Sequence, residues 1–198
     1  MENLEKIDLL QQELVKKWHL EKPEASADGF LGLVENQHLQ NFLLWHEEDI
    51  ARAPDVDDSE IAQVKRNIDK LNQKRNDLIE ALDESILQIL AENGSDINRN
   101  SPANSETPGS IIDRCSIMSL KIFHMKEETK RKDVSSDHIE EAKRKTKILQ
   151  IQREDLLTCL LQLVDDIKKG KRHFKLYKQF KMYNDPSLNP KIYSAKTQ

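Results

Sequence analysis

The sequence has few of the residues that build β-barrels, disulfide frameworks or membrane spans. Among 198 residues there are two cysteines, five glycines and six prolines, and aromatic residues make up 5%. These low counts, beside 33% charged residues, argue against a sandwich or a barrel. No apolar run reaches the roughly 18 residues that a membrane span requires, and the N-terminal MENLEKIDLL lacks the pattern of a signal peptide. We therefore expect a helical, cytoplasmic protein with an aliphatic core.

The two cysteines, Cys115 and Cys159, do not have the spacing of metal ligands. Thiols of cytosolic proteins are generally reduced, and unpaired cysteines are among the most buried residues. We predict that both are buried and that they form no disulfide.

Hydrophobic patterning predicts three helices in the first half of the chain. Apolar residues recur at helical spacing from Leu4 to Trp18, and again over 31–52 and 57–92. Residues 93–110, NGSDINRNSPANSETPGS, almost lack apolar side chains. This composition predicts a flexible linker inside a single helical domain of residues 1–198.

The pattern before the linker returns after it. The shift that carries His46 onto His124 also carries Trp45 onto Phe123 and Asp77 onto Asp155, without a gap. Such self-similarity indicates an ancient duplication of a helical hairpin, here residues 31–92 and 110–169. Two hairpins with one apolar face each bury those faces best against each other. The predicted fold class is all-α: a four-helix bundle of two duplicated hairpins, with an N-terminal helix and a basic C-terminal helix or tail.

Both long helices place an arginine on the apolar seam. Arg75 and Arg153 occupy the same position in the two repeats, where a spacing of three and four residues calls for leucine or isoleucine. A buried guanidinium needs a carboxylate partner, because burying it alone is very costly. The short helices offer a histidine and, one turn later, an acid. The sequence thus predicts two clusters: His46, Asp49 and Arg75 in one repeat, and His124, Glu127 and Arg153 in the other.

Three roles are open for these clusters. Arginine–acid pairs in helical bundles usually fix register and pairing. A second role is a polar pocket for an anionic ligand such as a phosphate or a sugar nucleotide. A third, a dinuclear metal site, is disfavoured because arginines stand where further acids would be needed, so no cofactor is expected. Beside the first cluster lie Trp45, which we expect in the core, and Glu48 with Arg52, a predicted exposed pair.

The C-terminal segment is basic although the chain has a net charge of −4. Residues 168–183, KKGKRHFKLYKQFKMY, contain no acid, and aromatic residues at intervals of three predict a helix that ends near Asn184. This helix either docks on the bundle or contacts an anionic membrane surface. Nucleic acid is disfavoured because the protein is acidic overall. The residues concerned are Lys171, Arg172, Lys175, Tyr177, Lys178, Lys181 and Tyr183.

Three segments, LWHEEDIAR, KRNIDKLNQKRNDLIEALD and FKMYNDPSLNP, carry a resemblance to a known family. The chain resembles a bacterial domain-of-unknown-function family, numbered four-two-five-four, over nearly its whole length. The resemblance implies a small helical cytosolic protein, encoded near glycosyltransferases for surface polysaccharide or lipopolysaccharide, and it transfers no catalytic residue.

Together these observations lead to two hypotheses. The first is a non-catalytic accessory protein that binds a glycosyltransferase or an anionic sugar during glycan assembly. The alternative is an enzyme acting on a phosphorylated sugar or nucleotide-sugar, with the His–carboxylate pairs as general acid and base. A homodimer formed through leftover apolar faces remains open.

Overall fold

The computed structural model describes residues 2–180 and 185–194; Lys181 and Tyr183 of the predicted tail lie outside these residues. The chain is all-α, as predicted. In chain order its elements are α1 (Glu2–Trp18), α2 (Gly29–Ile50), α3 (Asp58–Glu92), β1 (Ala103–Asn104), α4 (Pro108–Glu128), α5 (Ser136–Lys168), β2 (His173–Phe174) and α6 (Pro190–Tyr193).

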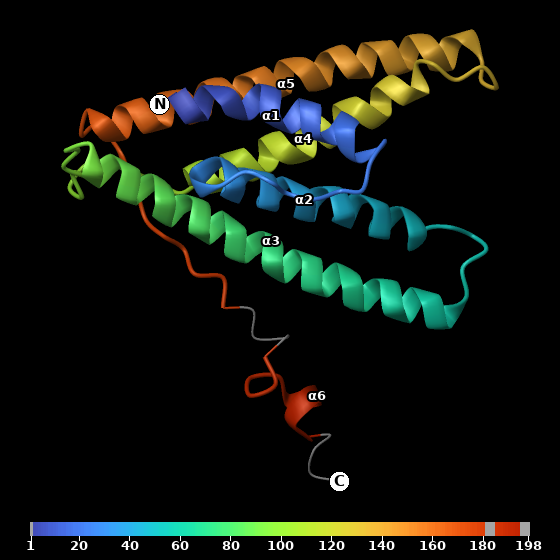
Figure 1. The fold of residues 1–198 in the computed structure, drawn as a ribbon, viewed down its shortest axis with the longest axis horizontal. Coiled ribbons are helices and arrows are strands. Elements are labelled where there is room, and N and C mark those ends of the chain that lie inside the picture. The colour runs from blue at the N-terminus through green and yellow to red at the C-terminus, as the bar shows by residue number, and fades with distance from the viewer. Residues whose placement is uncertain (1, 181–184, 195–198) are drawn as a thin grey trace.

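The helices form a bundle in which α1, α2 and α4 run in the same direction (Figure 1). The long helices α3 and α5 run the opposite way; α3 packs on α2 and α4, and α5 packs on α4 and α1. The two hairpins, α2–α3 and α4–α5, are the predicted repeats. The N-terminal helix is an integral part of the bundle, since α1 contacts both α2 and α4.

Side-chain caps define where the later helices begin. Asp57, Thr107 and Ser135 each have extended backbone and accept a hydrogen bond from a backbone N–H of the first turn of α3, α4 and α5. These caps satisfy donors that a helix start otherwise leaves unpaired. The hairpin boundaries therefore follow from local sequence.

The core is aliphatic and is built from the seam positions of helices α1 to α5. Its largest fully buried apolar side chains are Ile7, Leu82, Leu90, Ile111, Ile112, Leu120, Leu160 and Ile167. A polar layer crosses it, because Gln11, Gln37 and His38 are fully buried as well. Among the described residues, no helix is long and apolar enough to cross a membrane.

The prediction for the cysteines is half right. Both thiols are free and Cys115 is buried, but Cys159 is exposed. The reason is helical geometry: on α5, Leu156 and Leu160 occupy the buried seam, and Cys159 lies on the outer side between them.

The segment between the hairpins is tied to the chain that follows α5. Strand β1 pairs with β2 in parallel, His173 N donates to Pro102 O at 3.2 Å, and Asn98 Nδ2 donates to Gly170 O at 3.1 Å. Gly170, at φ 67°, ends α5.

The helix predicted over the basic tail is absent from residues 169–180. The chain there is extended, because Phe174 is buried in the core beside β1 and the following residues cross α3. At that crossing Lys178 Nζ lies 3.2 Å from Glu80 Oε2 and 3.0 Å from Glu84 Oε1. These contacts hold the backbone in a path that helical periodicity could not reveal.

Candidate functional site

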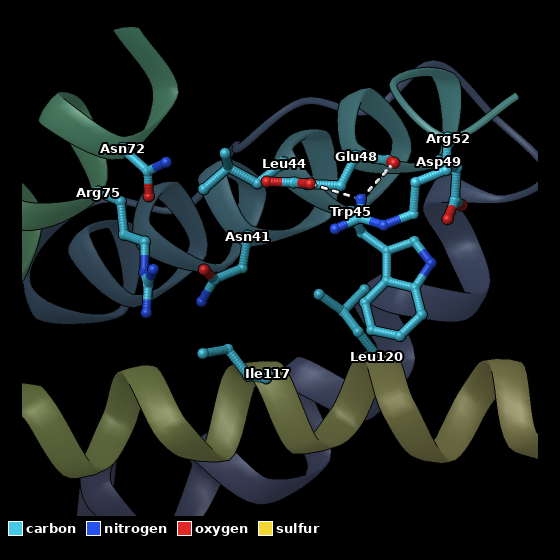
Figure 2. Close-up of a pocket in the computed structure, with 10 residues that line it drawn as sticks. All are labelled: Asn41, Leu44, Trp45, Glu48, Asp49, Arg52, Asn72, Arg75, Ile117 and Leu120. Carbon is cyan, nitrogen blue, oxygen red and sulfur yellow. Dashed lines mark hydrogen bonds and ion pairs between the residues drawn. The ribbon is translucent and has the colours of Figure 1, made fainter. Parts of the chain in front are cut away.

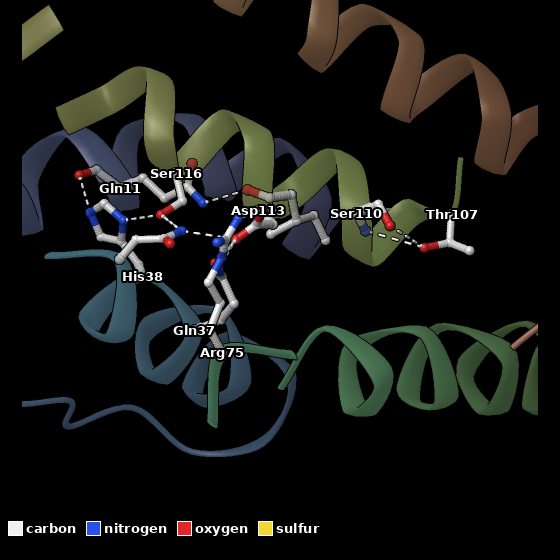
Figure 3. Close-up of polar contacts among 10 residues, drawn as sticks. Gln11, Gln37, His38, Arg75, Thr107, Ser110, Asp113 and Ser116 are labelled. Atoms are coloured by element: carbon white, nitrogen blue, oxygen red, sulfur yellow. Dashed lines mark hydrogen bonds and ion pairs between the residues drawn. The ribbon is translucent and has the colours of Figure 1, made fainter. Parts of the chain in front are cut away.

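Arg75 joins α3 to α4 of the other hairpin. Its Nε donates to Asp113 Oδ1 at 2.7 Å and its Nη2 to Oδ2 at 2.5 Å (Figure 3). The Asp113 side chain is 7% exposed, and hydrogen bonding to it raises the pKa of the Arg75 guanidinium. The predicted partner, Asp49, is therefore wrong.

Asp113 is the acceptor of a polar network at the centre of the bundle. Gln37 Nε2 and Asn41 Nδ2 donate to its Oδ1 at 2.5 and 3.0 Å. Asn41 also donates to Ser116 Oγ at 2.8 Å. The buried carboxylate thus has several donors besides Arg75, as a charge in the core requires.

His38 completes this layer in its neutral form. Its Nε2 donates to the carbonyl oxygen of Gln11 at 3.0 Å, and its Nδ1 lies 2.6 Å from Ser116 Oγ (Figure 3). A carbonyl only accepts, so Nε2 carries the hydrogen and Nδ1 accepts from the serine hydroxyl. Burial lowers the pKa of His38 to about 3.

Arg153 takes the same role towards α1. It is 3% exposed and donates to Asp8 Oδ1, to Gln11 Oε1 at 3.2 Å and to Ser119 Oγ at 2.8 Å. The predicted partner, Glu127, is wrong too: it forms an exposed pair with Lys130, which lies just beyond the C-terminal end of α4.

The antiparallel geometry of a hairpin explains both errors. Near the end of α2, Glu47 Oε1 accepts from Asn67 Nδ2 of α3 at 3.1 Å. Arg75 lies about two turns beyond Asn67, away from the hairpin tip that carries Asp49. An arginine this far from the hairpin tip contacts the neighbouring short helix, because the acid of its own hairpin lies near the tip.

The helix α1 shares a sequence pattern with the short helices α2 and α4, which the sequence analysis did not use. Asp8 and His19 have the same separation in the sequence as Asp113 and His124. The imidazole of His19 stacks on Phe123 at 4.0 Å and 21°, as that of His124 stacks on Trp45 at 4.5 Å and 5°. The signal was in the sequence: the dipeptide Trp18-His19 repeats Trp45-His46.

The two predicted histidines come together in one place instead of in two clusters. The ring centroids of His46 and His124 are 6.0 Å apart, and both lie beside His19 at 5.3 and 5.1 Å. Burial, followed by the charge of His19, lowers the pKa of His46 and lowers that of His124 to about 4. All three rings are half-buried.

A cavity of about 400 Å³ opens between α2, α3 and α4. In Figure 2, Asn72 and Arg75 lie at one end and Trp45 with Asp49 at the other. The α4 side of the cavity is apolar, formed by Ile117 and Leu120. The remaining lining residues are Asn41, Leu44, Glu48 and Arg52.

Several polar groups of this cavity have no partner among the described residues. The carboxylate of Asp49, the side-chain amide of Asn72 and the Nη1 of Arg75 make no hydrogen bond within that part of the chain. Glu48 and Arg52, in contrast, form the predicted exposed pair at 2.5 Å. The cavity thus combines free donors, a free carboxylate and one indole.

The residues predicted for the tail do not gather on one face. Lys171, Lys175 and Tyr177 are exposed, and Arg172 Nη1 donates to Asn104 Oδ1 at 3.2 Å. The backbone of these residues is not helical, and Lys178 pairs with two acids of α3.

Comparison with known proteins places the chain in a family whose function is unknown. The model of a family described as "Protein of unknown function (DUF4254)" matches residues 31–176, from α2 to just after β2. No curated protein and no solved structure matches the chain.

Proposed function

The chain belongs to this family of proteins of unknown function, and on that premise we propose that it is a non-catalytic accessory protein of surface-glycan assembly that binds a sugar unit in the cavity between α2, α3 and α4. A glycosyltransferase is the protein partner that this role implies. The observation that carries the proposal is the lining of the cavity: unpartnered hydrogen-bonding groups beside Trp45.

The hydrogen-bonding groups suit a ligand with many hydroxyls. Asn72 can both donate and accept, Arg75 Nη1 can only donate, and the carboxylate of Asp49 accepts. A sugar hydroxyl also donates and accepts, so neighbouring hydroxyls can satisfy this mixture. Trp45 adds a flat apolar surface, and sites for small molecules combine such surfaces with a few placed polar groups.

The charges favour an uncharged or amino sugar over a phosphorylated one. Arg75 is already neutralised by Asp113, and Arg52 is paired with Glu48. The unpaired charge that remains in the cavity is the carboxylate of Asp49. A phosphate would meet this negative charge and find no free cation in the cavity, so the proposal replaces the anionic sugar expected from the sequence by an uncharged or amino sugar.

The enzymatic alternative has less support from the geometry. General acid–base catalysis requires a titrating group within hydrogen-bond reach of the reacting atoms. His46 and His124 do not line the cavity; His124 lies behind Trp45, stacked on its ring. The pair of histidines therefore lacks direct access to a ligand bound there.

Calorimetric titration of the full chain tests the proposal. The probes are methyl glycosides of neutral hexoses and N-acetylhexosamines, with hexose 1-phosphates for comparison. We expect at least one neutral glycoside to bind, and Trp45→Ala and Asn72→Ala to weaken it by about tenfold or more, which is about 1.4 kcal/mol. The matched control is Gln150→Ala, at the position of the second hairpin equivalent to Asn72 and exposed on α5.

Two results would contradict the proposal. One is the absence of saturable binding by any neutral glycoside. The other is turnover of a hexose 1-phosphate that His46→Gln abolishes, because this would establish the enzymatic alternative.

A further inference from the structure

Three histidines from three different helices meet at one end of the bundle. His46 lies in α2, His124 in α4, and His19 directly follows the last residue of α1. Their ring centroids are separated by 5.1, 5.3 and 6.0 Å. Each lies at or near the C-terminal end of its helix and directly follows a tryptophan or phenylalanine. The proposed sugar site does not use them.

Two of these imidazoles carry a buried nitrogen without a partner. His19 Nδ1 lies 2.6 Å from the carbonyl oxygen of Val15, and because a carbonyl only accepts, Nδ1 carries the hydrogen. The Nε2 of the same ring then carries a lone pair, but it is buried and has no hydrogen-bond partner among the described residues. Within residues 2–180 and 185–194, the buried Nε2 of His124 has no partner either. Buried polar atoms of native proteins nearly always have a partner, so these two nitrogens are available to a ligand.

The surroundings of the cluster attract a cation. The helices α1, α2 and α4 run in parallel and end at Trp18, Ile50 and Glu128, so three C-terminal ends with their partial negative charge lie at the cluster. The charged groups that act on the histidines from these helices are the carboxylates of Asp49 and Glu127.

Burial favours the neutral form of His46 and His124. It lowers the pKa of His124 to about 4 and also lowers that of His46, with the neighbouring histidines adding to the effect. Neutral imidazole is the form in which histidine binds a metal ion.

We propose that His19, His46 and His124 bind one divalent transition-metal ion, of the class of Zn²⁺, through their ring nitrogens. Zn²⁺ lies about 2.0–2.1 Å from each imidazole nitrogen, which places the centroids of three rings on one tetrahedral ion about 5 Å apart. The observed separations are close to this value. Water supplies the fourth ligand. The hydrogen bond from His19 Nδ1 to Val15 O is the outer contact that fixes the tautomer of a metal-binding histidine.

Binding requires a rearrangement of side chains. In the described part of the chain, no three His, Cys, Asp or Glu side chains are already arranged to hold a metal ion. His46 can turn, since it is half-buried and makes no hydrogen bond to a described residue. The sequence argued against a metal because arginines were expected beside the histidines. Arg75 and Arg153 instead pair with Asp113 and Asp8, so that objection no longer holds.

The test is calorimetric titration of the full chain with ZnCl₂ at pH 7.5, after chelator treatment and dialysis. Co²⁺ serves as a second probe, because its visible absorption reports four-coordinate geometry. We expect one ion per chain. His46→Gln, His19→Gln and His124→Gln should each weaken binding by about tenfold or more, because each variant removes one of the three proposed ligands.

The control variant is His138→Gln, an exposed histidine outside the cluster that pairs with Glu128. It should bind as the unchanged protein does. His46→Gln decides the outcome even if the other variants unfold, since the native ring makes no hydrogen bond within the described chain. Failure to bind Zn²⁺ or Co²⁺ at a ratio of one per chain, or unchanged affinity in His46→Gln, would overturn the proposal. The sugar titration is independent of this result.

Discussion

Arg75 of α3 and Asp113 of α4 form a two-point ion pair that fastens the first hairpin to the second. Arg153 and Asp8 repeat this relationship between α5 and α1. In both cases a long helix places its arginine on the acid of the neighbouring short helix. The two pairs therefore connect elements that the chain itself does not join by a short loop.

Breaking the first pair should destabilise the fold. Arg75→Gln leaves the nearly buried carboxylate of Asp113 without its cation, so we expect the free energy of unfolding to fall by about 2–4 kcal/mol. Urea denaturation measures this change. The control, Arg52→Gln, removes an exposed pair and should cost about 0–1 kcal/mol. Equal effects of the two variants would show that Arg75 is not a structural contact.

Removing the second arginine should loosen α1 specifically. Arg153→Met eliminates the hydrogen bonds to Asp8, Gln11 and Ser119 and leaves those polar groups unsatisfied. We expect faster amide hydrogen exchange in residues 2–18 than in α2, measured by mass spectrometry. The control, Arg144→Gln, breaks an exposed pair with Glu141 on the same helix and should leave the exchange of α1 unchanged. Uniform loss of protection in all helices would contradict this role.

His38 should make the protein sensitive to acid. Its pKa is lowered from 6.5 to about 3 in the folded state, so the unfolded chain binds the proton more tightly. Its contribution to stability is present above pH 6.5 and is lost as the pH falls towards 3. The stability of the native protein, relative to His38→Gln, should fall by about 1.4 kcal/mol per pH unit in this range. Urea denaturation at several pH values checks this; a difference that does not vary with pH would contradict it.

Asp83 should have the opposite effect at higher pH. Burial raises its pKa from 3.8 to about 6, although its Oδ1 accepts the N–H of Gly109 at 2.7 Å. The folded state therefore binds this proton more tightly, and the resulting stability is present below pH 3.8 and lost as the pH rises through 6. Relative to Asp83→Asn, the native protein should lose roughly 2 kcal/mol between pH 4 and pH 7. Parallel denaturation curves at the two pH values measure the loss, and no change in the difference would refute it.

The thiols should differ in reactivity. Burial raises the pKa of Cys115 to about 12, whereas Cys159 is exposed. A disulfide reagent such as DTNB should modify one thiol per native chain, because the thiolate is the reactive form and must be accessible. Cys159→Ser should abolish this reaction and Cys115→Ser should preserve it. Rapid modification of both thiols in the native protein would contradict the burial of Cys115.

The helices and their repeat could be predicted because they depend on local sequence. The spacing of apolar residues around Ile68 and Leu82, and the cap at Asp57, are properties of neighbouring residues. The match between His46 and His124 revealed the duplication. The extended path of the tail was missed, because it depends on Phe174 filling the core and on the acids of α3.

The partners of the arginines could not be predicted in the same way. Periodicity places Arg75 and Arg153 on a buried face and thereby requires an acid for each, and this much the sequence alone determined. The sequence does not reveal the register in which the antiparallel helices pack, or which helix lies next to each arginine. The tertiary structure decided that Asp113 and Asp8 are the partners, and that His19, His46 and His124 meet, because packing of α1 and α4 onto the hairpins brings together residues that are far apart in the chain.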